Sequence, residues 1–218
     1  MIKVDLHIHT RYSMDASTTI EELTARCNEV GLGAIAITDH GTTEGALEFK
    51  KLSPIPIIVG EEILTDRGEI IGLFLTETIP SGQSVEATIK SIRDQGGLVC
   101  IPHPFDSLRG SALDPRITDQ LVESGQIDIL EVLNARIVLP SFVNKARDFA
   151  ARYGLAQSAG SDAHSPDELG KAYVLMQPFN NRDEFLSSLK NATIHGRCNS
   201  PLVHLNSTAQ RIKRKFTG

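Results

Sequence analysis

Residues 2–39 read IKVDLHIHTRYSMDASTTIEELTARCNEVGLGAIAITD and show the pattern that organises the whole chain. A short β-branched run at 2–7 is followed by a turn, then by apolar residues at helical spacing over 19–30, then by a second β-branched run at 34–39. Thr19 precedes a pair of glutamates, which is typical of a helix start. The segment therefore predicts a strand, a helix and a second strand in succession.

The same alternation continues through residue 190. Further β-like runs lie at 56–64, 69–75, 97–102, 127–133, 155–160 and 172–177, and helical stretches lie at 43–51, 84–95, 116–124, 141–152 and 182–190. Repeated units of this length favour a mainly parallel sheet with helices outside it. Seven or eight such units close into a barrel, although 218 residues is short of the roughly 250 of an eight-fold barrel. We predict one α/β domain over residues 1–218, as a distorted or incomplete barrel rather than an open sheet.

The composition excludes several classes of protein. Apolar residues make up 40% of the chain, which is enough for a substantial core and argues against extensive disorder. No apolar run approaches the ~20 residues that span a bilayer, the start lacks a signal peptide, and three well-separated cysteines suit a reducing cytoplasm. The net charge of −5 argues against a general nucleic-acid coat protein. The exception is RIKRK at 211–215, in a basic tail over about 207–218, which is either a solvated end or a contact for a nucleic-acid backbone.

Five of the seven histidines stand at or just after the end of a β-like run, and three carboxylates mark the same positions. The set comprises His7, His9, Asp15, His40, Glu62, His103, Asp162 and His164. The carboxyl ends of parallel strands meet on one face, so these side chains are expected in one pocket. His7 and His9 point the same way because side chains alternate along a strand.

Imidazoles and carboxylates gathered in this way are suitable ligands for Zn, Mn or Fe. Carboxylates crowded together repel one another unless cations lie between them, so we expect two or three divalent ions. Each residue taken alone has an ordinary alternative, as a hydrogen-bonded histidine or a helix-capping carboxylate. Eight independent structural roles at corresponding strand ends are a less simple explanation than one shared role in binding metal.

Five motifs in order carry a resemblance to a known family. DLHIHTRYSMD at 5–15, ITDH at 37–40, GEE at 60–62, PHP at 102–104 and GSDAHS at 160–165 together resemble the PHP (polymerase and histidinol phosphatase) family over at least residues 1–177. The resemblance implies a distorted (β/α)7 barrel with a site for two or three metals. Members of this family include phosphatases, nucleases and polymerase-associated domains.

The resemblance also implies which ligands share an ion. His7, His9, Glu62 and Asp162 would hold one metal, Asp15, His40 and His164 a second, and Glu62 with His103 part of a third. Glu61 is the competing carboxylate, and Glu62 is preferred because the family pattern is G-x-E. Members with three full sites carry a further histidine on the next strand, where Ile71 or Gly72 stands here, so the third site is expected to lack a ligand.

Three residues are candidates for substrate contact. Arg109 and Arg136 follow β-like runs and suit bidentate phosphate binding, although Arg136 could instead pair with Glu131 or with an acidic loop residue. Asn134 could orient a substrate or a ligand, or cap a turn. His103 and Asp15 are candidates for proton transfer as well as for metal binding.

The leading hypothesis is a phosphoesterase that hydrolyses a phosphate ester through a metal-activated hydroxide. The first motif resembles members that act on a nucleotide, a nucleoside bisphosphate or an RNA end more than histidinol phosphatases. The expected partner is therefore a small phosphorylated substrate or a nucleic-acid end, with no membrane and no obligate protein partner. The alternatives are hydrolysis of a C–N or carboxyl-ester bond, and a non-catalytic accessory domain stabilised by metal.

Overall fold

The computed structural model describes residues 1–198, in which strands and helices alternate as predicted. The strands are β1 (Ile2–Ile8), β2 (Leu32–Ile37), β3 (Ile57–Thr65), β4 (Gly68–Leu73), β5 (Leu98–Ile101), β6 (Ile129–Asn134), β7 (Ala156–Gly160), β8 (Ala172–Met176) and β9 (Thr193–Gly196). The helices are α1 (Ile20–Val30), α2 (Glu44–Leu52), α3 (Val85–Asp94), α4 (Pro115–Glu123), α5 (Pro140–Tyr153) and α6 (Arg182–Leu189), with a 3-10 turn at η1 (Pro166–Glu168). The basic tail over 207–218 lies outside the described residues.

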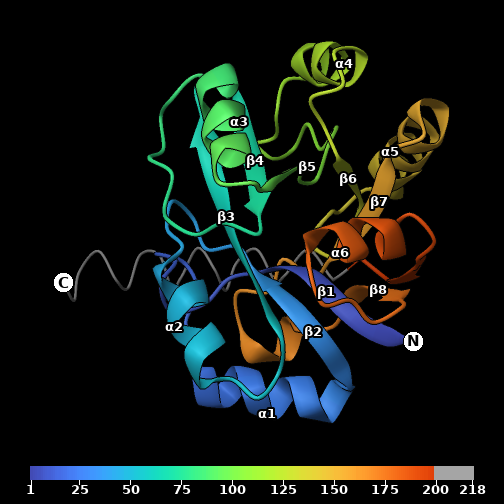
Figure 1. Cartoon of the computed structure of the whole chain (residues 1–218). Helices are drawn as coiled ribbons and strands as arrows, with labels where there is room; N and C mark the ends of the chain where they lie inside the picture. The colour runs from blue at the N-terminus through green and yellow to red at the C-terminus, as the bar shows by residue number, and fades with distance from the viewer. Residues whose placement is uncertain (199–218) are drawn as a thin grey trace.

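The strands form one sheet in the order β7-β6-β5-β4-β3-β2-β1-β8-β9 (Figure 1). β1, β2 and β3 run parallel, as do β5, β6 and β7, whereas β4 is antiparallel to both of its neighbours. The end of β1 bonds to the segment after β7, with the His9 N–H donating to the Ala163 carbonyl at 2.9 Å and the Asp162 N–H to the His7 carbonyl at 2.8 Å. These bonds nearly close the sheet, and the prediction of an α/β fold with a distorted barrel is confirmed.

Local chemistry sets the helix ends close to where they were predicted. Thr19 and Glu22 form a capping box at the start of α1, and the side chain of Asn181 caps the start of α6. Gly31 and Gly154 end α1 and α5 in the left-handed conformation, which glycine adopts without steric cost. Each predicted helix boundary is therefore within one residue of the observed one.

Two features of the sheet were not predicted. β4 folds back on β3 through a tight turn, in which the Thr65 hydroxyl donates to the Gly68 carbonyl at 2.6 Å. β9 adds an antiparallel strand beside β8, and its residues are partly or fully exposed. A four-residue exposed strand carries no apolar alternation, so the sequence offers little signal for it.

The core lies on both faces of the sheet. One apolar cluster includes Leu23 and Phe49 from the outer helices, and a second includes Val4 and Phe185. Within residues 1–198, none of the helices combines the length and the apolar character that crossing a bilayer requires.

Candidate metal centre

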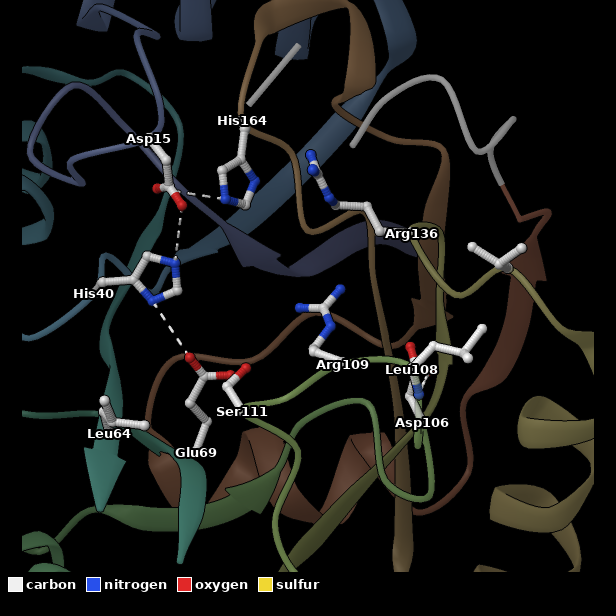
Figure 2. Close-up of a pocket in the computed structure, with 11 residues that line it drawn as sticks. Asp15, His40, Leu64, Glu69, Asp106, Leu108, Arg109, Ser111, Arg136 and His164 are labelled. Carbon is white, nitrogen blue, oxygen red and sulfur yellow. Dashed lines mark hydrogen bonds and ion pairs between the residues drawn. The ribbon is translucent and has the colours of Figure 1, made fainter. Parts of the chain in front are cut away.

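All eight predicted ligands lie together at the carboxyl ends of the parallel strands. β1 and the residue just beyond it supply His7 and His9, the following loop supplies Asp15, the segment after β2 supplies His40, β3 supplies Glu62, and the segments after β5 and β7 supply His103, Asp162 and His164. Most of these side chains are buried, and only His40 and Asp15 keep appreciable exposure, at 27% and 18%. Segments far apart in sequence thus build one cluster beside an open cavity (Figure 2).

His7, His9 and Asp162 form the most deeply buried group, with one ligand atom of each within 4.8 Å of the others. The Nε2 atoms of His7 and His9 face each other at 3.1 Å, and the Asp162 Oδ1 atom lies 3.2 Å from His9 Nε2. Glu62 Oε2 lies 3.4 Å from His7 Nε2. Two imidazole nitrogens and two carboxylate oxygens that converge in this way form a ligand set for one cation.

His9, His40 and His164 form a second group within the same 4.8 Å limit. Asp15 joins it, with its oxygens 3.7 Å from His40 Nε2 and 3.5 Å from His164 Nε2. Burial alone would raise the pKa of Asp15, but the hydrogen bond from His164 and the charges of His164, His40 and His9 together lower it below its usual value. An ionised Asp15 among three imidazoles suits a second cation.

The third group contains a carboxylate that the sequence analysis missed. Glu69, at the start of β4, joins His40 and Glu62 in a possible ligand set. Its Oε2 atom lies 3.4 Å from Nε2 of His103, which in turn lies 2.9 Å from Oε1 of Glu62. Figure 2 shows the Glu69 carboxylate pointing towards His40. Burial and the charge of Glu62 raise the pKa of Glu69 to about 8.

The position of Glu69 changes the expectation for the third site. Ile71, one of the two residues at which the resemblance implies a histidine, is buried in an apolar cluster. Glu69 lies two residues earlier on the same strand and therefore on the same face. A carboxylate at position 69 can therefore supply the ligand from β4 that neither Ile71 nor Gly72 can.

Glu61 and Glu62 point to opposite faces of β3, as neighbouring strand residues must. Glu61 Oε2 accepts a hydrogen bond from the Ile79 N–H at 2.9 Å, away from the histidines, and burial raises its pKa to about 7. The geometry therefore favours Glu62 as the ligand.

Hydrogen bonds fix which nitrogen of each histidine faces the cluster. His7 Nδ1 lies 3.1 Å from Glu131 Oε1, and His9 Nδ1 lies 3.1 Å from Ser13 Oγ, whose hydroxyl donates to Asp39. These acceptors hold a proton on Nδ1 and leave the Nε2 lone pair directed at the cluster. The sequence offered Glu131 only as a possible partner of Arg136, and Asp39 only as part of the ITDH motif, so their contacts with His7 and Ser13 were not predicted.

The donor set fits divalent cations on direct structural grounds. Five buried carboxylate oxygens have no hydrogen-bond partner among the described residues. Glu61 Oε1 lies outside the cluster, and the other four belong to it: Asp15 Oδ1, Glu62 Oε2, Glu69 Oε2 and Asp162 Oδ1. Buried charged oxygens without partners are costly unless a cation coordinates them. The cluster can therefore hold metal ions, as the sequence predicted.

The three candidate substrate residues differ in position. Arg109 and Arg136 both line a cavity of about 520 Å³ beside the cluster. The Arg109 Nη2 atom donates to Asp162 at 2.8 Å. Arg136 pairs with Glu168 at 3.2 Å, as expected for the alternative in which it contacts an acidic residue near the site. Asn134 is fully buried and is not part of the cavity lining.

Asn134 instead donates hydrogen bonds to two carboxylates at the ligand cluster. Its amide donates to Glu131 Oε2 at 3.0 Å and to Asp162 Oδ2 at 3.2 Å. Of the roles that the sequence left open, the geometry favours the orientation of a ligand.

Comparisons with known proteins agree with this geometry. The family pattern described as PHP domain matches residues 5–125, and the one described as PHP-associated matches residues 140–194. The chain is 42% identical over 147 residues to the uncharacterized protein MJ1587 of Methanocaldococcus jannaschii, covering 62% of this chain and 82% of that protein. It is 34% identical over 203 residues to MJ0417 of the same organism, covering 87% of this chain and 79% of that protein.

A solved structure shares the fold. A two-domain protein of Bacteroides vulgatus, which contains a predicted PHP-like metal-dependent phosphoesterase, superposes with a TM-score of 0.70 at 19% identity. The match covers 90% of this chain and 65% of that protein.

Proposed function

This chain belongs to the PHP domain family, and from that membership and the geometry of its centre we propose that it is a metal-dependent phosphoesterase. The observation that carries the proposal is the convergence of imidazole nitrogens and unpartnered carboxylate oxygens on one space beside a cavity with two arginines. A site of two or three divalent cations next to guanidinium groups is suited to phosphoryl chemistry.

The ligand roles follow the three groups described above. His7, His9, Glu62 and Asp162 would hold one ion, and Asp15, His40 and His164 would hold a second. Glu62, Glu69 and His103 would hold a third. Divalent cations at these positions would supply Lewis-acid activation of water and neutralisation of the phosphate charge.

The residues of the chain bind and orient the phosphate ester. Arg109 reaches the cavity, and Asp162 and Glu62 raise its pKa even though burial opposes the charge, so the guanidinium stays charged beside the phosphoryl oxygens. Arg136 adds a second positive group to the lining of the cavity, and its guanidinium forms an ion pair with Glu168. Asp15 lines the cavity whereas His103 is fully buried, so we assign proton movement near the substrate to the carboxylate of Asp15 and a ligand role to His103.

The substrate we propose is a nucleotide, a nucleoside bisphosphate or an RNA end. A cavity of about 520 Å³ is within the usual range for a ligand of nucleotide size. Its lining combines two arginines with apolar side chains, which suits a molecule with both a phosphate and a larger organic part.

Two assays on one preparation test the proposal. Metal content per chain is measured after purification without chelator, and phosphate release is measured from a nucleoside monophosphate, a nucleoside 3′,5′-bisphosphate and a short single-stranded RNA. We expect at least two ions per chain and release that a chelator abolishes. Bound ions without release from any phosphate ester would contradict the proposal and favour the accessory or C–N hydrolase alternatives.

A further inference from the structure

Asp106 is a buried carboxylate that the proposed function does not use. It lies in the segment after β5, is 4% exposed, and lines the cavity of about 520 Å³ beside the metal centre. The carboxylates of Asp15 and Glu69 line the same cavity, but each of them belongs to a group of candidate metal ligands. Within the described residues, Asp106 is therefore the one carboxylate of the cavity lining without an assigned role.

The two oxygens of the Asp106 carboxylate have different surroundings. Oδ1 accepts the backbone N–H of Leu108 at 3.2 Å, which is a common way for an aspartate to stabilise a turn. No hydrogen bond or ion pair within residues 1–198 involves Oδ2, and this atom is not one of the buried oxygens that lack a partner. Oδ2 is therefore accessible from the cavity, where it can accept a hydrogen bond from a bound molecule.

Asp106 lies across the cavity from the candidate metal ligands (Figure 2). Asp15 and Glu69 lie on one side of the view, Asp106 lies with Leu108 on the other, and the guanidinium group of Arg109 lies between the two sides. A phosphoryl group bound at the cations and at Arg109 would therefore have its organic part directed towards Asp106 and Leu108. This side of the cavity is where the alcohol of a phosphate ester would be recognised.

The charges around Asp106 indicate which hydrogen-bond donor it would accept. An ammonium group would have to enter a lining that already contains the guanidinium groups of Arg109 and Arg136, and like charges repel. A hydroxyl group has no charge and still donates one hydrogen bond. Leu108, which is 65% exposed, offers apolar surface to the carbon skeleton beside that hydroxyl. The lining therefore favours a hydroxyl group over an amine.

We infer that Asp106 is a specificity-determining residue that selects a phosphate ester whose alcohol carries a second, free hydroxyl group. The hydroxyl would donate to Oδ2, whereas an analogue without it would displace water from Oδ2 and leave that oxygen without a donor. A ribonucleoside carries such hydroxyl groups. The inference rests on the proposed phosphoesterase function and assigns the residue that recognises the organic part of the substrate.

The test compares three phosphate esters on the metal-loaded full chain. They are adenosine 5′-monophosphate, its 2′,3′-dideoxy analogue, and p-nitrophenyl phosphate, which has no hydroxyl group on its organic part. Asp106→Asn keeps an oxygen for the Leu108 N–H and replaces Oδ2 with an amide nitrogen, which donates instead of accepting. The variant therefore preserves the turn and removes the acceptor.

Asp119→Asn is the matched control, because Asp119 is exposed on α4 and is not part of the cavity lining. Metal content is measured for every variant, so that a loss of ions is detected separately. In the wild type, we expect the KM for adenosine 5′-monophosphate to be about tenfold below that for the dideoxy analogue, which is the factor that a hydrogen bond to a charged group provides.

In Asp106→Asn, the KM for adenosine 5′-monophosphate should rise about tenfold, while the KM values for the other two esters and the metal content stay at the wild-type values. The control should match the wild type for all three esters. Equal KM values for the two nucleotides in the wild type overturn the inference. An equal rise for all three esters in Asp106→Asn also overturns it, and would assign Asp106 to the turn alone.

A wild type that hydrolyses neither nucleotide gives a distinct result. Release of nitrophenol from p-nitrophenyl phosphate would then leave the phosphoesterase function standing and overturn the inference, because the ester without the hydroxyl group would be preferred to one that carries it. No release from any of the three esters would contradict the phosphoesterase function itself, and the inference would fail with it.

Discussion

Glu131 connects two of the candidate metal ligands through its two carboxylate oxygens. Oε1 lies 3.1 Å from Nδ1 of His7, and Oε2 accepts the backbone N–H of His103 at 2.7 Å. His103 has a positive φ of 31°, which a side-chain-bearing residue adopts only with support from its surroundings. One carboxylate therefore orients a histidine of β1 and holds the backbone after β5.

Glu131→Gln tests this role. An amide keeps the shape but has one acceptor oxygen instead of two, so one of the two contacts is lost. We expect metal affinity to fall about 10- to 100-fold, the usual cost of losing a group that orients a ligand. Competition with a coloured chelator measures the affinity, and Glu123→Gln on the exposed face of α4 is the control. Equal affinities in the two variants would show that Glu131 does not tune the centre.

Glu69→Gln tests the third group of ligands. The amide cannot supply a charged oxygen to the space shared with Glu62 and His103, so the variant should bind one ion per chain fewer than the wild type. The measurement is metal content by atomic emission after dialysis. Glu61→Gln is the matched control, because its amide can still accept from the Ile79 N–H on the other face of β3. Wild-type stoichiometry in Glu69→Gln would argue against a ligand role.

Removal of metal should lower stability. Without cations, one buried oxygen each of Glu62 and Asp162 is left with no hydrogen-bond partner among the described residues. A cation at 100 times its Kd stabilises the fold by roughly 2.7 kcal/mol, so the Tm should fall by several degrees in chelator and return when metal is added. His7→Gln, which loses a ligand, should show a smaller fall, measured by calorimetry. A Tm that does not respond to chelator in the wild type would contradict metal binding.

Arg109→Lys separates phosphate binding from metal binding. Lysine keeps the charge but loses the planar fork that binds two phosphoryl oxygens. We expect KM for the phosphate ester to rise by about tenfold, since charge-assisted bidentate bonds contribute about 1.5–3 kcal/mol. Metal content should stay at the wild-type value, because the lysine still neutralises Asp162. Parallel losses of metal and of activity would instead assign Arg109 to support of Asp162.

The predicted site residues stand in short local motifs, whereas the site residues that were not predicted depend on contacts between distant parts of the chain. His7 and Asp162 stand in short motifs at strand ends, so local pattern and the rule that parallel strands converge were enough to place them. Glu131 is 124 residues from His7, and only the closed barrel shows that the two side chains meet. Glu69 was not predicted because the resemblance implies a ligand at position 71 or 72, and because β4 reverses direction at a turn whose geometry the sequence does not show.

Gly160 shows why β7 can approach β1 closely enough to build the centre. A Cβ at this position would collide with the Cβ of His7 and would lie 2.8 Å from Oε1 of Glu131. Gly160→Ala should therefore separate the two strands, at a cost of roughly 3 kcal/mol for overpacking in a core. Urea unfolding in chelator measures this cost apart from any loss of metal, and Gly110→Ala is the control, since a Cβ there meets nothing within 4 Å. We expect Gly110→Ala to unfold as the wild type does, and equal midpoints in the two variants would mean that β1 and β7 tolerate a wider separation than the distances indicate.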